Sequence, residues 1–257
     1  MKIDKDIFLG KKILIYGLGK SGISTFKFLK KRADAYLFDD NQKTNLKIIT
    51  INQVIKTKFD IIIISPGINI SNCKLSKFLN KNLDKIYTDL DVFYSFYKNT
   101  SIAITGTNGK STTAKILFDI LTDQKKDVRL IGNIGNPALS EKKISKKTFF
   151  VIEVSSYQLE YSKIFSAKYA VILNISTDHI ERHKNLTNYV NAKFKLLDSQ
   201  NNKSFAFVKK NDQLINKKIR KSKFKPKIYK VNTIKINEGG QPQSTRKSRL
   251  VIRHVLL

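Results

Sequence analysis

Cysteine, tryptophan and histidine are scarce in this 257-residue chain, which contains one cysteine, no tryptophan and three histidines. The lone Cys73 cannot form an internal disulfide, which is typical of a protein in a reducing cytoplasm. Apolar runs such as residues 61–64 are far too short to cross a bilayer, and the first residues contain no apolar signal segment. We therefore expect a cytoplasmic protein with no membrane partner.

Acidic residues are also few: the chain has 20 Asp and Glu against 49 Lys and Arg, which gives a formal net charge of +29. Such an excess can indicate nucleic-acid binding when the basic residues form a stripe with interleaved aromatics. Here the lysines are spread along the whole chain, and Lys, Ile, Asn and Phe are all used heavily, as in a genome-wide compositional bias. We therefore expect no nucleic-acid partner.

The sequence does contain an alternation of apolar runs and helical patterns, which predicts an α/β fold built on parallel sheets. A polar break at residues 98–100 interrupts this alternation, so we expect one domain over residues 1–97 and a second over residues 98–237. From residue 238 to residue 257 the chain becomes rich in arginine and loses asparagine. We expect this atypical tail to be foreign sequence, a frameshift or a broken gene end, and we exclude it from the fold.

The most informative stretch covers residues 101–113, where a short apolar run leads through a glycine turn into a helical pattern at 114–121. This order of strand, turn and helix N-terminus is typical of a phosphate-binding loop, because backbone N–H groups face the anion. Lys110 would reach the terminal phosphates, and the Ser111 hydroxyl would bind Mg²⁺. The strict pattern G-x-x-x-x-G-K-[ST] is not met, because its first glycine would fall at Ile104. The alternative is a glycine-rich turn with an exposed lysine.

A second glycine motif follows a predicted strand at residues 11–16 and consists of Gly17, Leu18, Gly19, Lys20, Ser21 and Gly22. The next predicted strand, 35–38, ends at Asp39, about twenty residues beyond the glycines, as a dinucleotide-binding fingerprint requires. This motif alone is weak evidence for NAD, because any nucleotide diphosphate could sit on that helix N-terminus, and a turn without a ligand is a further alternative. The strand at 59–64 ends in Ser65, Pro66 and Gly67, which form either a second wall of this site or an ordinary turn.

Two strands of the second domain also end in reactive side chains. The strand at 148–154 carries Glu153 near its end, and the strand at 169–175 is followed by His179. Since parallel strands share one carboxyl edge, these side chains can hold Mg²⁺ on a nucleotide bound at Lys110. The alternatives are a buried salt bridge between Glu153 and a lysine, and a structural role for His179.

A helix is expected at residues 187–197, with Thr187 or Asn185 as its cap. Lys193 lies on the same face of this helix as its apolar residues, so it points inward. An inward lysine either snorkels to the surface or is modified so that its charge is removed or inverted. Shortly before this helix, His183 is expected to be an exposed helix residue.

Taken together, these motifs resemble those of the Mur ligases of peptidoglycan synthesis, and most of all those of the members that add D-glutamate to UDP-N-acetylmuramoyl-L-alanine. The resemblance covers about the first 200 residues. It rests on six motifs in the order of the family, at residues 17–22, 65–68, 104–112, 132–135, 153–160 and 174–183. The phosphate loop of the family also lacks the extra leading glycine, which accounts for the mismatch at Ile104.

The resemblance implies a Rossmann-like parallel-sheet domain that binds the UDP part of UDP-N-acetylmuramoyl-L-alanine, and not NAD. It implies that a P-loop-type α/β domain then binds ATP. The UDP substrate would contact Gly17, Leu18, Gly19, Lys20, Ser21, Gly22, Asp39, Ser65, Pro66 and Gly67 in the first domain, and Asn133, Ser155 and Gln158 in the second. ATP would contact Gly106, Thr107, Asn108, Gly109, Lys110, Ser111 and Thr112.

The resemblance also implies two magnesium sites and a catalytic set formed by Lys110, His179 and Lys193. Ser111 would help to hold Mg²⁺, Glu153 would bind the first ion and His179 the second. Lys193 matches the lysine that the family carbamylates, which would make it an anionic ligand of the second ion. The implied reaction is ATP-dependent amide formation, in which the alanyl carboxylate becomes an acyl phosphate and the amine of D-glutamate displaces phosphate. We expect a monomer.

One departure from the family concerns length. Family members are much longer than this chain and carry a C-terminal domain that supplies the amino-acid site, and no such domain is visible in this sequence. We therefore expect the isolated chain to be inactive alone, and incorporation of D-glutamate by the purified chain would contradict this. The alternative functions are another Mur ligase, an NAD-dependent oxidoreductase that uses the first glycine motif, and a non-catalytic nucleotide-binding remnant.

Overall fold

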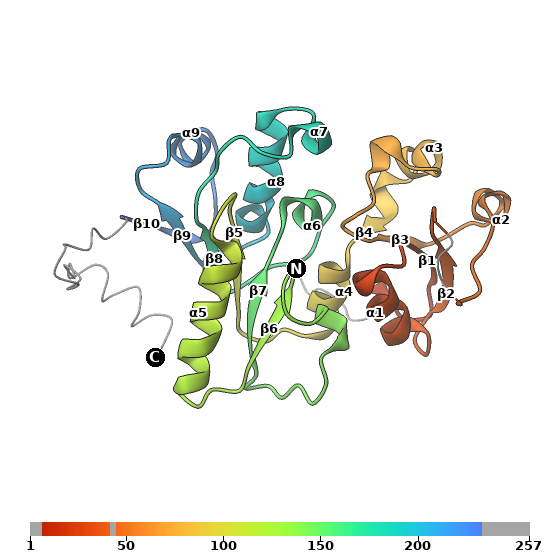
Figure 1. Ribbon diagram of the computed structural model, residues 1–257, viewed down its shortest axis with the longest axis horizontal. Helices are drawn as coiled ribbons and strands as arrows, with labels where there is room; N and C mark the ends of the chain where they lie inside the picture. Colours follow the sequence, from red (N-terminus) through yellow and green to blue (C-terminus); the bar gives the residue numbers. More distant parts are fainter. Residues whose placement is uncertain (1–6, 42–44, 233–257) are drawn as a thin grey trace.

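The computed structural model describes residues 7–41 and 45–232 of the chain. Two α/β units, each built on a parallel sheet, lie side by side (Figure 1). The α/β class expected from the sequence is therefore confirmed. The atypical tail predicted at residues 238–257 lies outside the described residues.

The first unit contains a four-stranded sheet with the order β2-β1-β3-β4, in which every neighbouring pair is parallel. Its strands are β1 (Lys12–Tyr16), β2 (Asp34–Phe38), β3 (Ile61–Ile64) and β4 (Ile86–Tyr87). Its helices are α1 (Lys20–Leu29), α2 (Ile51–Lys56), α3 (Ser76–Asn80) and α4 (Asp89–Phe96), with short 3₁₀ turns η2 (Ile70–Asn72) and η3 (Leu83–Lys85). Apart from Lys12, the residues of β1 and β3 are apolar and buried, as expected for a parallel sheet covered by helices.

The second unit contains a six-stranded parallel sheet with the order β10-β9-β8-β5-β7-β6. Its strands are β5 (Ser101–Thr105), β6 (Val128–Gly132), β7 (Phe149–Glu153), β8 (Tyr169–Ile172), β9 (Phe205–Lys209) and β10 (Lys227–Val231). Its helices are α5 (Lys110–Asp123), α6 (Ser156–Glu160), α7 (Ile180–His183), α8 (Leu186–Asp198) and α9 (Gln213–Lys221), with a 3₁₀ turn η4 (Ala138–Ser140). The α5 helix packs on one face of the sheet and α8 on the other, so β5 is covered on both sides (Figure 1).

The expected strands are all present, and their bounds differ from the predictions by only a few residues. The helix predicted at 187–197 is α8, and its cap is Asn185, whose side chain accepts a hydrogen bond from the Asn188 N–H. In the described part of the chain, no helix has the length and the apolar character needed to span a membrane.

The two units share a packed boundary formed by α1 and α4 on one side and η4 on the other. The rings of Phe93 in α4 and Phe150 in β7 meet edge to face, with their centroids 4.9 Å apart. The buried carboxylate of Asp91 in α4 also crosses the boundary, because its Oδ1 accepts hydrogen bonds from Ser162 Oγ and from the N–H groups of residues 163–165. The placement of one unit against the other is therefore set both by packing and by hydrogen bonds.

Candidate active site

The carboxyl ends of three neighbouring strands meet at one edge of the second sheet. The β5 strand lies between β7 and β8 and runs parallel to both, and Glu153 is the register partner of Ile104. The phosphate loop follows β5, Ser155 follows β7, and His179 lies in the segment after β8. The strands that carry the expected metal and phosphate residues therefore end side by side, as the sequence predicts.

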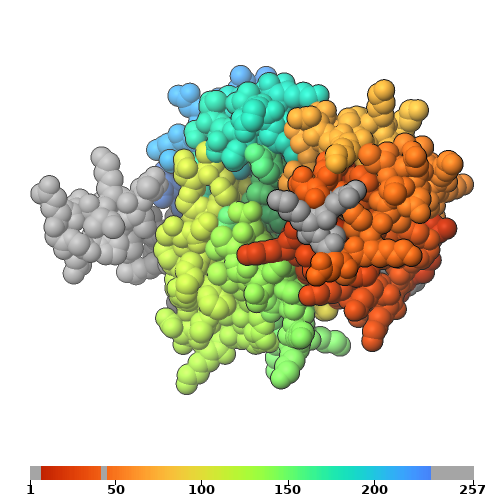
Figure 2. All heavy atoms as spheres, turned by 45° about the vertical axis from the view of Figure 1, so that its right-hand side comes forward, coloured from red at the N-terminus to blue at the C-terminus, as the bar shows by residue number. Residues whose placement is uncertain are grey.

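A cavity of about 380 Å³ opens at this edge and reaches the first unit. It lies where the two units meet, and Figure 2 shows their boundary between the red-to-orange first unit and the green-to-cyan second unit. The expected site residues that line it are Pro66, Gly67, Lys110, Asn133, Ser155, His179 and Lys193. The other lining residues are Ser156, Tyr157 and Tyr189. One cavity therefore brings together residues expected to contact phosphate, metal and substrate.

The loop between β5 and α5 has the backbone of a phosphate-binding turn. Gly109 precedes α5 in a left-handed conformation with a φ of 81°, which glycine adopts without strain. Lys110 Nζ donates hydrogen bonds to the carbonyl oxygens of Gly106, at 3.0 Å, and Thr107, at 2.8 Å, so its ammonium group lies over the loop. The loop and the first turn of α5 also expose three polar residues, Asn108, Ser111 and Thr112.

Asn174, in the segment after β8, holds this loop from the other side. Its Oδ1 accepts a hydrogen bond from Asn108 N at 2.9 Å, and its Nδ2 donates to Asn108 O at 3.0 Å. Its backbone oxygen accepts from Thr107 N at 2.9 Å, and the Tyr189 hydroxyl of α8 lies 3.1 Å from Thr107 Oγ1. Neither Asn174 nor Tyr189 is among the predicted site residues. An asparagine just beyond a buried strand is the sequence signal that could have indicated such a clamp.

Glu153 is only 1% exposed, and its two carboxylate oxygens have different surroundings. Oε1 accepts a hydrogen bond from Asn133 Nδ2 at 2.9 Å, whereas Oε2 is buried and has no hydrogen-bond partner among the described residues. The ion pairs found in the described ranges do not include Glu153, so the structure does not contain the salt bridge with a lysine considered above. An unpaired buried carboxylate oxygen is costly, and this atom is therefore suited to bind a cation such as Mg²⁺.

Gly132 brings Asn133 against Glu153. The φ of Gly132 is 108°, and a Cβ at this position would lie 2.2 Å from the backbone oxygen of Glu153. Asn133 N donates to the same oxygen at 2.9 Å. Only glycine therefore allows the loop after β6 to approach the end of β7 this closely.

Lys193 is 2% exposed, which confirms that it points inward. Its Nζ donates a hydrogen bond to Gly106 O at 2.8 Å and lies 4.5 Å from the centroid of the Tyr189 ring. Burial, and then the positive charge of Lys110, lower the pKa of Lys193 from 10.5 to about 7, while Asp178 acts in the opposite direction. A large fraction of this amine is therefore uncharged at neutral pH.

His179 has a left-handed backbone with a φ of 52° at the start of α7, and its side chain is 43% exposed. Its Nε2 lies 3.4 Å from Asp178 Oδ2, and its ring centroid lies 5.0 Å from that of Tyr157. Across the described residues, no group of three or more His, Cys, Asp and Glu side chains could hold a metal ion. A metal at this edge would therefore need other ligands as well, such as phosphate oxygens or the Ser111 hydroxyl.

The prediction that His183 is exposed is wrong, because this residue is 2% exposed. Its Nε2 lies 3.0 Å from Ser156 Oγ, and its Nδ1 lies 3.9 Å from Glu160 Oε1. The one-turn helix α7 packs against α8, and the ring of Tyr189 closes over His183 with centroids 5.3 Å apart. Burial lowers the pKa of His183, which favours the neutral imidazole. We infer that His183 has a structural role in this neutral form.

In the first unit, the glycine turn is held by residues expected to contact the UDP substrate. Gly17 has a φ of 92°, and its carbonyl oxygen accepts a hydrogen bond from Ser65 Oγ at 2.6 Å. Asp39 Oδ2 accepts a hydrogen bond from Leu18 N at 2.6 Å, and its Oδ1 accepts one from Asn41 N at 2.8 Å. Both carboxylate oxygens are therefore hydrogen-bonded to backbone N–H groups. The rest of the turn is formed by Gly19 and by the first residues of α1, which are Lys20, Ser21 and Gly22.

Ser155 and Gln158 form the cap of α6. Ser155 Oγ accepts a hydrogen bond from Gln158 N at 3.2 Å, and Gln158 Oε1 accepts one from Ser155 N at 3.1 Å. Ser155 lines the cavity, whereas Gln158 is 2% exposed and is not a lining residue. The structure therefore brings Ser155 but not Gln158 to the cavity wall.

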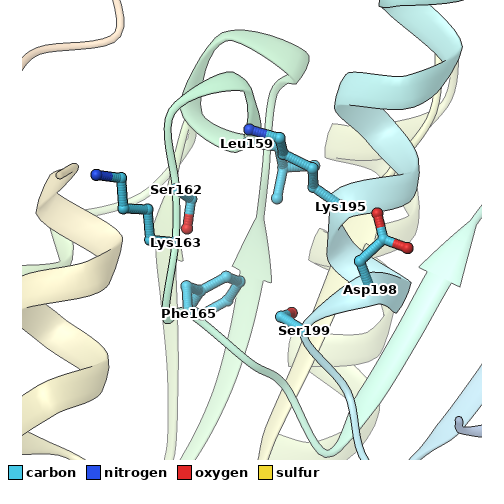
Figure 3. Close-up of a pocket in the computed structure, with 7 residues that line it drawn as sticks. All are labelled: Leu159, Ser162, Lys163, Phe165, Lys195, Asp198 and Ser199. Carbon is cyan, nitrogen blue, oxygen red and sulfur yellow. The ribbon is translucent and has the colours of Figure 1, made fainter. Parts of the chain in front are cut away.

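A second cavity, of about 250 Å³, lies beside the last turn of α8 and is lined by Leu159, Ser162, Lys163, Phe165, Lys195, Asp198 and Ser199. Figure 3 shows Lys163 and Lys195 on two of its sides. Their ammonium groups donate to backbone oxygens, of Leu83 for Lys163 and of Glu160 for Lys195. None of the predicted site residues lines this cavity, so it is separate from the candidate active site.

Three comparisons relate the chain to known proteins. The family model of the Mur ligase middle domain matches residues 104–251. A UDP-N-acetylmuramoylalanine–D-glutamate ligase of Rickettsia felis is 38% identical over 208 residues, which are 77% of this chain and 46% of the relative. A ligase of the same name from Clostridioides difficile is 32% identical over 248 residues, which are 90% of this chain and 54% of the relative. The chain spans about half the length of these relatives.

Among solved structures, one similar fold is that of a UDP-N-acetylmuramate:L-alanyl-γ-D-glutamyl-meso-diaminopimelate ligase from Neisseria meningitides. The superposition has a TM-score of 0.57 and 14% sequence identity, and it covers 96% of this chain and 94% of that chain. At this identity the likeness concerns the fold alone. The middle-domain match, by contrast, extends over more than half of the sequence. The chain therefore belongs to the Mur ligase family.

Proposed function

We propose that the chain acts in the ATP-dependent formation of an amide bond between UDP-N-acetylmuramoyl-L-alanine and D-glutamate, through an acyl phosphate, in peptidoglycan synthesis. The proposal is supported by the names of the relatives that match most of the chain. The structural observation that carries it is the unpaired Oε2 of Glu153, which lies at the sheet edge where Lys110 begins α5. We also propose a monomer that works in the cytoplasm, with no nucleic-acid or membrane partner.

The phosphate-binding role would be carried by the loop between β5 and α5. Its members are Gly106, Thr107, Asn108, Gly109, Lys110, Ser111 and Thr112. Lys110 Nζ donates hydrogen bonds to the loop's own carbonyl oxygens, and these bonds would hold the ammonium group beside the terminal phosphates. Positioning and neutralisation of charge are the main contributions that a protein makes to phosphoryl transfer.

The metal role would be shared by Ser111, Glu153, His179 and Lys193. The buried Oε2 of Glu153 fits the first of two Mg²⁺ ions, and the exposed imidazole of His179 fits the second. Bound Mg²⁺ would neutralise phosphate charge and polarise the transferred group. Apart from binding metal, Glu153 would orient Asn133, and His179 would orient Tyr157.

Lys193 would serve this site as a carbamate. An uncharged amine can add to CO₂, forming an N–C bond and releasing one proton, and the product carries a negative charge. The lowered pKa of Lys193 makes the uncharged amine available near neutral pH. The carbamate would be a buried anion beside the Lys110 ammonium group. It would therefore serve both as the counterion of Lys110 and as a metal ligand.

The UDP-sugar would lie across the boundary of the two units. In the first unit it would contact the glycine turn, Asp39, Ser65, Pro66 and Gly67, and in the second unit Asn133 and Ser155. The buried Gln158 would act on the substrate only through the helix cap that it forms with Ser155. The cavity is lined by Pro66 and Gly67 from the first unit and by Asn133 and Ser155 from the second. A substrate that bridges the units fits this arrangement.

Binding of MgATP to the purified chain tests the proposal, with the Lys110→Ala variant and with Lys115→Ala as a matched control from the exposed side of the same helix. We expect Lys110→Ala to weaken MgATP binding by at least about tenfold, because a charge-assisted hydrogen bond to phosphate is lost, and Lys115→Ala to leave it unchanged. Equal affinities of the wild type and Lys110→Ala would refute the phosphate role.

Separate titrations with UDP and with NADH then distinguish the ligase from an oxidoreductase that would use the first glycine motif. We expect UDP to bind and NADH not to bind.

A further inference from the structure

The cavity of the candidate active site has walls from both units. Pro66 and Gly67, which follow β3, belong to the first unit, whereas Tyr157 and His179 belong to the second. A ligand that touches both walls binds more tightly when their separation is already fixed, because no ordering of the two units has to accompany binding. The side chains that fix this separation therefore matter to binding even if they touch no ligand.

Arg182 in α7 makes the hydrogen bond that joins these walls. Its Nη2 donates to the backbone oxygen of Ile68 at 2.7 Å, and Ile68 directly follows the Pro66–Gly67 wall. Its Nε pairs with Glu160 Oε2 of α6 at 3.2 Å, and its guanidinium carbon lies 4.9 Å from the centroid of the Tyr157 ring. The side chain is only 7% exposed. Three partners, the Ile68 carbonyl of the first unit and the Tyr157 and Glu160 side chains of α6, therefore hold one planar guanidinium group, a geometry that lysine cannot reproduce.

At its other end, this connection reaches His179. Arg182 and His179 lie in the same helical turn, because Arg182 N donates to His179 O at 3.2 Å. The Tyr157 ring contacts both side chains, since its centroid lies 5.0 Å from that of the His179 ring. A shift of Arg182 is therefore expected to move the imidazole that faces the cavity.

Within the first unit, the connection continues from Ile68 to the glycine turn. A Cβ on Gly17 would lie 2.9 Å from Cγ1 of Ile68 and 2.9 Å from Cβ of Ser65, so the two segments are in close contact. Ile68 N also donates to Ser65 O at 3.0 Å. The loop that Arg182 holds is thus packed directly on the turn expected to contact the UDP part of the substrate.

We propose that Arg182 is a positioning residue that couples the Ser65–Ile68 loop of the first unit to the His179 turn of the second. Its hydrogen bond to Ile68 O transmits the placement of the UDP-binding wall to the wall that faces the nucleotide. The effect of Arg182 on UDP binding rests on the proposed function. The link that Arg182 makes between the two walls is a property of the protein without ligand.

Hydrogen–deuterium exchange of the free chain tests the mechanical link, with Arg182→Lys as the variant and Arg220→Lys, on the exposed side of α9, as the control. We expect Arg182→Lys to speed exchange about tenfold in residues 66–72 and in α7, while the strands β1 and β5 keep their protection. Unchanged exchange in residues 66–72 would overturn the proposal. A uniform rise over the whole chain would overturn it too, because that result indicates a general loss of stability.

Addition of UDP gives a second readout that a purely structural role would not change. We expect UDP to slow exchange in α7 of the wild type but not in α7 of Arg182→Lys, and the affinity for UDP to fall about tenfold in the variant. Slowing of α7 in both proteins would contradict the coupling. If the wild type does not bind UDP, the proposed substrate site fails, and the exchange of the free proteins still decides whether Arg182 links the walls.

Discussion

Replacement of Asp91 by asparagine tests what holds the two units together. The Asp91 side chain is fully buried in α4, and its Oδ1 accepts four hydrogen bonds from the segment of residues 162–165 in the second unit. Its Oδ2 accepts two more, from the N–H and the hydroxyl group of Thr88. Asparagine has nearly the same shape but is neutral, and one of its two terminal groups can only donate.

The expected loss in the free energy of unfolding of Asp91→Asn follows from these hydrogen bonds. In the best orientation the amide oxygen of asparagine faces residues 162–165, and each of these four bonds loses about 1 kcal/mol when its acceptor loses its charge. The amide NH₂ then faces the N–H of Thr88, which is left unpaired at a cost of about 1–3 kcal/mol. Since the variant no longer buries a charge, several kcal/mol are recovered, and we expect a net loss of about 3 kcal/mol in the free energy of unfolding.

Thermal unfolding, followed by circular dichroism, measures this effect. For a chain of this size a loss of about 3 kcal/mol lowers the Tm by roughly 6–12 °C. Asp119→Asn is the control, because it removes the same charge from an exposed pair with Lys115, whose removal costs at most about 1 kcal/mol. If Asp91→Asn unfolds within about 1 kcal/mol of Asp119→Asn, the reasoning about the buried carboxylate is refuted.

Three further changes probe the candidate active site. Glu153→Gln is expected to weaken magnesium-dependent nucleotide binding by at least about tenfold, with little change in stability. Calorimetry with and without Mg²⁺ checks this against Asp123→Asn, which removes an exposed carboxylate at the far end of α5. Gly132→Ala is expected to lower the free energy of unfolding, measured by urea titration, by at least about 2 kcal/mol, because the new Cβ would lie 2.2 Å from Glu153 O. The control Gly67→Ala should lower it by less, because no atom lies within 4 Å of the Cβ that it adds. Lys193 has a lowered pKa of about 7, so between about pH 7 and pH 10 the unfolded chain binds one more proton than the folded chain. In CO₂-free buffer, the stability of the wild type relative to Lys193→Met should therefore rise with pH in this window, by up to about 1.4 kcal/mol per pH unit in urea titrations, and a falling difference would contradict the burial of an uncharged amine.

The features that could be predicted from sequence are those that depend on local patterns. Buried strands appear as short apolar runs, and in a parallel sheet the residues after them gather at one edge, which located Lys110, Glu153 and His179 together. The inward direction of Lys193 follows from the period of an α-helix. The assignment of these residues to ATP, Mg²⁺ and substrate remains a proposal.

The features that were missed depend on contacts between distant segments. His183 looks like an exposed residue because α7 is too short for its burial to show as a periodic pattern, and its burial is set by Ser156 and Tyr189. Asp91 and Arg182 act through partners more than seventy residues away in the chain, at Ile164 and Ile68 respectively. The strands β9 and β10 were not predicted. Lysines interrupt the apolar pattern of β10, whereas the apolar run of β9 at residues 205–208 is uninterrupted and could have indicated a strand.

The central place of β5 in its sheet has a consequence for how the molecule acquires its binding properties during folding. The loop after β5 takes its shape from Asn174 beyond β8, and Glu153 is delivered by β7, so both neighbouring strands must dock before a nucleotide can be held. Pairings between strands so far apart in sequence form slowly, after local helices. Nucleotide affinity should consequently appear late and all at once, when helical circular dichroism has already largely recovered, and a partly denatured chain should lose its ligand before it loses its helices.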